Sequence, residues 1–339
     1  MRAVVTTGHG GLDRLEVREV PVPRPGPDQV LVRVAAAACN NTDLWTREGT
    51  YGTADQPSGW IGPVGFPRIQ GGDAAGTVVA VGDGVDSGLE GRRVLVDPAI
   101  YDEDGLLPGD ILGSERDGGF AEYLLAPACA AHVVDGSPLS DPELASLPIA
   151  YGTALGMLER SGARAGDTVL ATGASGGVGV AAVQLAKARG CTVVAVSSGD
   201  KADAVREAGA DHVVDRGRGS LVDDVRRVAP AGLHAVIDVV AGPFLTEGLS
   251  LLRPGARWVV AGSLAGAVTD VDVRKLYLAN QSLVGSTMHT PGMFADLAEM
   301  ARRGTIRPLV AQTFALADLA RAQEVLLRRE HVGKLVVLP

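Results

Sequence analysis

The residues with the clearest potential for chemistry form a glycine-rich turn, Gly-Ala-Ser-Gly-Gly-Val-Gly, at positions 173–179. The turn follows an apolar strand expected at Thr168–Thr172 and precedes an amphipathic helix expected at Val178–Arg189. Glycine lets the backbone approach a pyrophosphate, and a helix N-terminus presents free N–H groups to it. A plain turn without a ligand uses the same residues, but this context favours a dinucleotide site. The predicted phosphate contacts are Ala174, Ser175, Gly176, Gly177, Val178 and Gly179.

The end of the next strand indicates which dinucleotide is bound. NAD-binding proteins usually place Asp or Glu there, where it accepts hydrogen bonds from the ribose hydroxyls. This chain instead has Ser197 and Ser198, followed by Asp200 and Lys201. Small hydroxyls and a lysine suit a 2′-phosphate better than a ribose diol. Two alternatives stay open: Asp200 as an NAD-type acid, and Lys201 as a solvated charge at a helix start. We predict NADPH as the cofactor.

The elements that must position these residues alternate along the second half of the chain. Strands expected at 192–197, 212–214, 235–240 and 258–262 are separated by helical segments. Repeated βα units of this kind build a parallel, doubly wound sheet. The pattern therefore predicts an α/β dinucleotide-binding domain over residues 140–290.

The first half of the chain is β-rich instead. Short β-branched runs are separated by proline- and glycine-rich turns, and a short helix is expected at 41–48. A final strand at Lys334–Leu338 could complete this domain. We predict a second domain composed of residues 1–139 and 291–339.

Composition limits the classes of function. The chain has 339 residues, enough for two domains, and 46% of them are hydrophobic. A net charge of −9 argues against binding to nucleic acid or to anionic membranes. The N-terminus resembles no secretion signal, and no apolar run is long enough to span a bilayer. Three widely separated cysteines fit a reducing compartment. We expect a soluble, cytoplasmic protein.

Six segments in one order carry a family resemblance. They are PGPDQVLVRVAAAACNNTDLWTREG, IQGGDAAGTVVAVGDGV, GSERDGGFAEY, LPIAYGTAL, ASGGVG and HVGKLVVLP. Over nearly its whole length the chain resembles the medium-chain dehydrogenase/reductase superfamily. The resemblance implies a GroES-like catalytic domain, a Rossmann dinucleotide domain, and a substrate cleft between the two.

The resemblance also identifies three positions at which zinc-dependent alcohol dehydrogenases carry metal ligands. Asn40, Gly72 and Ile149 stand there in this chain. A catalytic zinc needs about three protein ligands, and an amide, a hydrogen and an alkyl group are poor replacements. Cys39 is one residue away, but neighbouring residues on a strand point to opposite faces. We predict that the protein binds no catalytic zinc.

The pattern Asn40-x-x-Asp43, with Tyr51 following, is more similar to the zinc-free quinone oxidoreductase branch. That likeness implies that Asn40 lies near the nicotinamide and the substrate, and that Trp45 and Tyr51 line the substrate pocket. Ordinary packing is an equally good explanation for the two aromatic residues. The remaining cofactor contacts that we assign on this basis are Thr153, Arg216, Val240, Gly262, Ser263 and Lys334.

The expected chemistry follows from the missing metal. Without zinc, no strong Lewis acid polarises a simple carbonyl, whereas a conjugated enone or quinone spreads charge to a distal oxygen. Thr42 and Tyr51 are the proton donors that we choose. Asp73 is a possible general acid, although a carboxylate bound to backbone or to an arginine is the better expectation.

We therefore predict an NADPH-dependent, zinc-independent oxidoreductase that transfers hydride to a small enone or quinone. A zinc-independent alcohol dehydrogenase or ketone reductase is the first alternative, and a non-catalytic NADPH-binding protein is the second. The segment Ser282–Thr287 reads as an apolar edge strand. An edge of this kind needs a cover, and family members commonly pair there, so we expect a homodimer.

Overall fold

The computed structural model describes residues 1–51, 64–101 and 107–339. It divides into two compact units. The first unit comprises Met1–Ile149 and Thr290–Pro339, and the second comprises Ala150–His289. No helix in the described part of the chain is long and apolar enough to cross a membrane.

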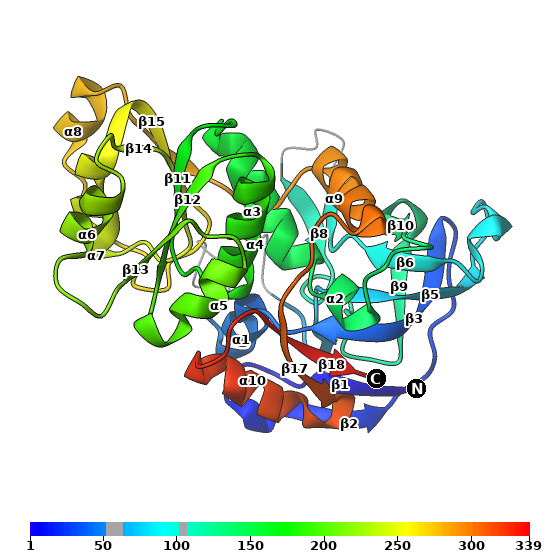
Figure 1. Ribbon diagram of the computed structural model, residues 1–339. Coiled ribbons are helices and arrows are strands. Elements are labelled where there is room, and N and C mark those ends of the chain that lie inside the picture. The colour runs from blue at the N-terminus through cyan, green and yellow to red at the C-terminus, as the bar shows by residue number, and fades with distance from the viewer. Residues whose placement is uncertain (52–63, 102–106) are drawn as a thin grey trace. The chain divides into compact units, whose positions relative to one another are not determined.

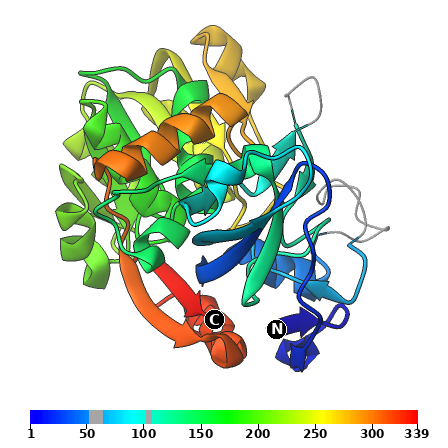
Figure 2. The same cartoon turned by 90° about the vertical axis from the view of Figure 1, so that its right-hand side faces the viewer.

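The first unit is built mainly of antiparallel sheet. Its strands are β1 (Arg2–Thr6), β2 (Leu15–Glu19), β3 (Gln29–Ala38), β4 (Arg68–Ile69), β5 (Ala74–Val81), β6 (Arg93–Val96), β7 (Ala99–Tyr101), β8 (Pro108–Ile111), β9 (Tyr123–Pro127), β10 (Ala131–Val133), β17 (Val310–Ala315) and β18 (Lys334–Leu338). Its helices are α1 (Asn41–Glu48), α2 (Asp141–Ala145), α9 (Pro291–Arg303) and α10 (Leu319–Arg328). Both chain termini belong to this unit and lie on the same side of it (Figures 1 and 2).

The long strand β3 organises the first unit. The main sheet has the order β10-β6-β5-β3-β18-β17, and β9 also pairs with β3. Val30, Val32 and Val34 of β3 are buried in the core. Leu31, whose side chain points to the opposite face, is buried as well. Pairing of β18 with β3 brings the C-terminal segment beside the start of α1. Residues nearly 300 positions apart in the sequence therefore become neighbours.

Helix α1 begins at this corner, directly after Asn40. The Asp43 carboxylate in its first turn accepts from the Asn40 backbone N–H at 2.7 Å, and Gly49 ends the helix in the left-handed region at φ 77°. Both features satisfy backbone groups that a helix end leaves unpaired. The helix occupies residues 41–48, as the sequence predicts.

The second unit is a parallel sheet with helices on both faces. Its strands are β11 (Thr168–Ala171), β12 (Thr192–Ser197), β13 (His212–Asp215), β14 (Leu233–Asp238), β15 (Leu252–Val260) and β16 (Ser282–Gly285). Its helices are α3 (Pro148–Ser161, mostly in this unit), α4 (Gly177–Ala188), α5 (Ala202–Glu207), α6 (Leu221–Val228), α7 (Pro243–Gly248) and α8 (Val273–Leu278). Figure 1 shows α3 and α4 on one face of the sheet and α6 and α7 on the other.

The strand order of this sheet is β13-β12-β11-β14-β15-β16, and every pairing is parallel. This is the Rossmann strand order, in which the sheet first grows to one side of β11 and then, from β14, to the other side. Nucleotides bind beyond the carboxyl ends of the strands at that switch point. In this chain the switch point lies between β11 and β14, directly before the glycine-rich turn. The predicted α/β fold class, with its doubly wound parallel sheet, is therefore correct.

The boundary between the units differs from the one suggested by the sequence. The expected dinucleotide domain starts at residue 140, whereas the structural division falls after Ile149. Helix α2 causes the difference, because it packs against β3 and β5 of the first unit and buries Leu144 and Ala145 there. The apolar residues of this segment have helical spacing, like those of the βα units that follow. Sequence pattern alone therefore assigns the segment to the dinucleotide-binding domain.

Candidate functional site

Three hydrogen bonds hold the Asn40 carboxamide at the start of α1. The residue is 8% exposed. Its Nδ2 donates to Oδ2 of Asp73 at 2.9 Å and to the Ala38 carbonyl at 3.3 Å. Its Oδ1 accepts from Nζ of Lys334 at 2.6 Å. Three segments of the first unit therefore meet at this carboxamide.

Asp73 is an acceptor in every contact that it makes here. Oδ1 accepts from the Ile149 backbone N–H at 2.7 Å, and Oδ2 accepts from Asn40 and from Lys334, the latter at 3.0 Å. The side chain is completely buried. Three donors, one of them the Lys334 ammonium, therefore converge on this carboxylate. Its charged partner is a lysine rather than an arginine, and its role as a general acid stays a prediction.

The positions that match metal ligands are filled by packing. A Cβ atom built on Gly72 would lie 3.2 Å from Cδ1 of Ile149 and 3.1 Å from the Leu112 carbonyl oxygen. Among the described residues, no three His, Cys, Asp or Glu side chains are placed to hold a metal ion. The residues at these positions therefore do not fit a catalytic zinc.

A small void lies beside these positions. It measures about 10 Å³, and the residues that line it include Thr42, Asp43, Thr46, Gly72 and Ser114. A void of this size holds about one water molecule and no more. The predicted proton donor Thr42 therefore shares a polar pocket with a buried carboxyl group.

Asp43 is a residue whose importance the sequence left unassigned. It is 4% exposed, and Oδ2 accepts from the Asn40 backbone N–H at 2.7 Å. Burial, with the negative charge of Asp73 adding to it, raises the pKa of Asp43 to about 7, although the bond from Asn40 opposes this shift. A carboxyl group with this pKa can hold or release a proton near neutrality. The signal was available, because Asp43 belongs to the quoted Asn40-x-x-Asp43 pattern.

Trp45 and Tyr51 contact each other at the end of α1. Their rings meet edge to face, with centroids 5.2 Å apart and an interplanar angle of 84°. Burial raises the pKa of the Tyr51 hydroxyl, so it stays protonated and able to donate. The pair is thus partly a packing contact, and its predicted role in lining a substrate pocket stays a prediction.

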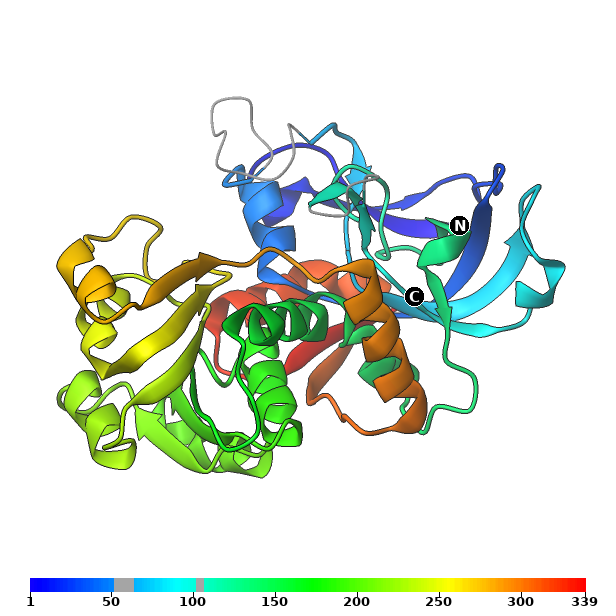
Figure 3. The same ribbon diagram turned by 90° about the horizontal axis from the view of Figure 1, so that it is seen from above.

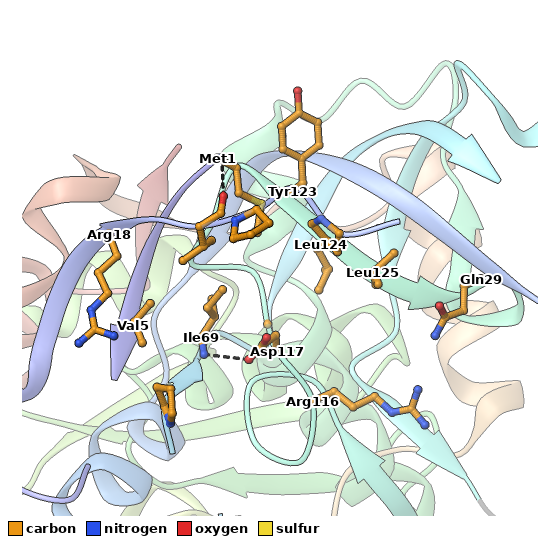
Figure 4. Close-up of a pocket in the computed structure, with 15 residues that line it drawn as sticks. Met1, Val5, Arg18, Gln29, Ile69, Arg116, Asp117, Tyr123, Leu124 and Leu125 are labelled. Atoms are coloured by element: carbon orange, nitrogen blue, oxygen red, sulfur yellow. Dashed lines mark hydrogen bonds between the residues drawn. The ribbon is translucent and has the colours of Figure 1, made fainter. Parts of the chain in front are cut away.

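A larger cavity of about 520 Å³ lies elsewhere in the first unit (Figure 4). Valine, proline and leucine side chains make up much of its wall, together with Arg18 and Arg116. Both arginines are paired with carboxylates, those of Glu16 and Asp110 respectively. The described residues that line this cavity include none of those predicted to act in catalysis or cofactor binding.

In the second unit, the glycine-rich turn joins β11 to α4 as predicted. Gly173 adopts the left-handed region at φ 57°. A Cβ atom on Gly179 would lie 2.6 Å from Cα of Ala174, so only glycine lets the helix pack this closely on the turn. Gly176 caps α4 and is exposed. The first turn of this 12-residue helix presents the backbone N–H groups that a pyrophosphate needs.

The end of β12 brings the predicted 2′-phosphate residues together. Ser197 is 2% exposed, and its buried hydroxyl has no hydrogen-bond partner. A hydrogen bond from the Ser198 side chain is the main cause that lowers the pKa of Asp200, and the charges of Lys201 and Arg216 lower it further. Two cations and an acid therefore share this strand end. The acid offsets part of the positive charge that a phosphate would meet.

A buried carboxylate that the sequence did not identify fixes the loop after β14. Oδ1 of Asp238 accepts from the Thr172 hydroxyl at 2.6 Å and from the backbone N–H groups of Val240 and Ala241 at 2.9 and 3.0 Å. Its Oδ2 accepts from the Trp258 indole at 2.8 Å. These bonds hold Val240, a predicted cofactor contact, at the switch point of the sheet.

The other predicted cofactor contacts of this unit lie on neighbouring segments. A Cβ atom on Gly262 would lie 2.7 Å from the Val239 carbonyl, so the segments after β14 and β15 approach closely, and Ser263 follows Gly262 on the second of these. Thr153 is 8% exposed on α3, and its hydroxyl lies 3.9 Å from the Met288 sulfur.

Comparison with known proteins agrees with this architecture. Residues 26–136 match the family model "Alcohol dehydrogenase GroES-like domain", and residues 177–303 match "Zinc-binding dehydrogenase". The human quinone oxidoreductase is 30% identical, with all of this chain and 98% of the relative covered. An acryloyl-coenzyme A reductase from Sulfurisphaera tokodaii is 29% identical, with both chains covered completely.

A solved structure gives a further comparison. The putative alcohol dehydrogenase from Sinorhizobium meliloti 1021 is 45% identical, with a TM-score of 0.94 over all of this chain and 96% of that one. These similarities define the class of protein as a two-domain, nucleotide-dependent dehydrogenase or reductase. The chain belongs to the medium-chain dehydrogenase/reductase superfamily, and it is an oxidoreductase of that type. The resemblance inferred from the six sequence segments is confirmed.

Proposed function

We propose that this oxidoreductase uses NADPH to reduce a conjugated enone or quinone without a metal ion. The observation that carries the proposal is the packing at the three metal-ligand positions, where Ile149 contacts Gly72 and the Asn40 carboxamide is bonded to Lys334 and Asp73. A conjugated acceptor needs no Lewis acid, because hydride addition places the developing charge on a distal oxygen.

NADPH supplies the hydride, and the residues of this chain orient the nucleotide and provide a proton. In the second unit, the turn at 173–179 fits a pyrophosphate, and the unpartnered Ser197 hydroxyl with Lys201 and Arg216 fits a 2′-phosphate. In the first unit, Thr42 and Tyr51 are the proposed proton donors. Asp43 shares a pocket with Thr42 and is its proposed source of protons.

Reduction of a simple ketone, or oxidation of an alcohol, is a second candidate function. The 45% identity to a putative alcohol dehydrogenase favours it, because that is the highest identity among the relatives described above. This alternative uses the same nucleotide site. It requires hydrogen-bond donors strong enough to polarise an unconjugated carbonyl.

The test is an NADPH-oxidation screen over quinones, enones, aldehydes and ketones. We expect turnover with quinones or enones and little with simple ketones. Turnover confined to aldehydes and ketones would support the second function. Tight NADPH binding without oxidation by any acceptor would contradict both functions and indicate a non-catalytic binder.

We also propose that the protein is a homodimer, joined through the edge strand β16. This strand pairs only with β15 in the second unit, and Leu283 on it is 42% exposed. Tyr277 and Leu278 of α8, 64% and 76% exposed, add apolar surface near this edge, and Figure 3 shows α8 beside the yellow strands of the unit. Light scattering should give twice the chain mass, and Leu283→Lys should give the monomer. A monomeric wild type at micromolar concentration would contradict the proposal.

A further inference from the structure

A buried polar cluster in the first unit uses all the donors of its lysine. The cluster consists of Asn40, Asp73 and Lys334, which are 8%, 0% and 5% exposed. Nζ of Lys334 donates to the Cys39 carbonyl at 2.8 Å, to Oδ1 of Asn40 at 2.6 Å and to Oδ2 of Asp73 at 3.0 Å. An ammonium group has three N–H donors. Lys334 therefore has none left for the cofactor contact assigned to it from the sequence.

The same bonds determine which atom of Asn40 is left for a ligand. Both N–H groups of Nδ2 are used, by Asp73 and by the Ala38 carbonyl. Oδ1 accepts one hydrogen bond from Lys334 and has a second lone pair. The amide cannot be reversed, because its nitrogen would then face an ammonium and its oxygen a carboxylate. Asn40 can thus offer a ligand an acceptor but not a donor.

We propose that Lys334 and Asp73 are positioning residues. Their ion pair fixes the Asn40 carboxamide, so that its oxygen accepts a hydrogen bond from a hydroxyl or amide N–H at the nicotinamide end of the bound nucleotide. This role rests on the proposed function, because it requires Asn40 to face the nucleotide. Net stability is a poor explanation for the pair, because well-packed apolar residues of similar volume often stabilise a protein equally well.

The experiment separates positioning from stability with a paired replacement. Lys334→Met and Asp73→Leu are made singly and together, and melting temperature, NADPH dissociation constant, nicotinamide fluorescence and kcat are measured. Each single change leaves a buried group without its partner, so both should melt well below the wild type. The double variant should recover most of the melting temperature.

Despite that recovery, we expect the double variant to keep a kcat at least tenfold below the wild type and to lose the wild-type emission shift of bound NADPH. Its NADPH dissociation constant should stay within threefold of the wild type. The control is a second lysine–aspartate pair, Lys187 and Asp211, with Nζ and Oδ1 2.6 Å apart and both side chains partly exposed. The double change Lys187→Met with Asp211→Leu should alter none of the ligand measurements.

Two results would overturn the proposal. Recovery of kcat and of the emission shift together with the melting temperature would show a purely structural pair. A tenfold or greater loss of NADPH affinity in the double variant, diminishing at high salt, would instead assign Lys334 a direct contact with a cofactor phosphate. If none of the acceptors supports NADPH oxidation by the wild type, the proposed function fails. The emission shift and the dissociation constant of NADPH still decide the role of this pair in that case.

Discussion

The polar cluster of the first unit and the strand ends of the second unit are built in opposite ways. Around Asn40, a buried lysine and a buried carboxylate satisfy each other within the unit. At the end of β12, the buried Ser197 hydroxyl has no partner, and Arg216 is exposed. A buried polar group without a partner is unfavourable. The first region is therefore complete by itself, whereas the second is incomplete, and we propose that a ligand completes it.

The largest expected effect comes from breaking the complete region. Asp73→Ala removes the counter-charge of Lys334 and the acceptor of the Ile149 N–H, so we expect the free energy of unfolding to fall by about 3–5 kcal/mol. Denaturant unfolding followed by circular dichroism measures it. Asp200→Ala, at a fully exposed acid of the other region, is the matched control and should leave the unfolding midpoint unchanged. Equal midpoints for the two variants would contradict the comparison.

Asp43 should give the complete region a characteristic pH dependence. Its pKa is about 7 in the folded protein and 3.8 ordinarily, so the unfolded chain releases this proton at lower pH. The contribution of Asp43 to the free energy of unfolding is therefore full below pH 4 and is lost as the pH rises to about 7. We expect a loss of roughly 2–4 kcal/mol relative to Asp43→Asn across this window.

Denaturant unfolding of wild type and Asp43→Asn at pH 4.5, 6 and 7.5 measures this difference. The comparison cancels the other titrating groups, because both proteins share them. A free-energy difference between the two proteins that stays constant from pH 4.5 to 7.5 would mean that Asp43 titrates as an ordinary aspartic acid.

Removing cations from the incomplete region should affect ligand binding rather than stability. Lys201→Ala should weaken NADPH much more than NADH, and the double change with Arg216→Ala should nearly erase the preference. Each lost charge-assisted contact is worth about 1.5–3 kcal/mol, roughly tenfold or more in affinity. Asp200→Asn should act in the opposite direction, because this acid offsets the positive charge. Fluorescence titration of the wild type and the variants with both nucleotides measures these affinities. Equal affinities for NADH and NADPH in the wild type would refute the NADPH assignment.

Removal of metal ions should leave the activity unchanged, which is the smallest effect expected. The positions that hold zinc ligands in metal-dependent relatives are packed against each other or bonded internally in this chain. The purified protein should contain no stoichiometric zinc and should keep its activity in a strong chelator. Elemental analysis that finds about one tightly bound zinc per chain, with activity lost on its removal, would overturn this.

The sequence by itself determined the family, the order of elements in the second unit and the position of the phosphate-binding turn. These features are local: a βα unit, its glycines and its hydrophobic period lie within about thirty residues of one another. The substitutions at positions 40, 72 and 149 could also be read directly from the sequence. The helix at 141–145 was assigned to the dinucleotide-binding domain, although it packs against strands of the first unit. Periodicity identifies a helix but not the sheet against which it packs.

Only the tertiary structure decided which groups the buried carboxylates bond and how deeply they are buried. Asp73 could not be paired with Lys334 from the sequence, because the two are 261 residues apart and meet only through the pairing of β18 with β3. Asp43 and Asp238 were missed because their burial cannot be read from the residues beside them in the sequence. Whether a carboxylate titrates near neutrality or anchors a loop depends on its burial and its donors, and both are properties of the packed chain rather than of its local sequence.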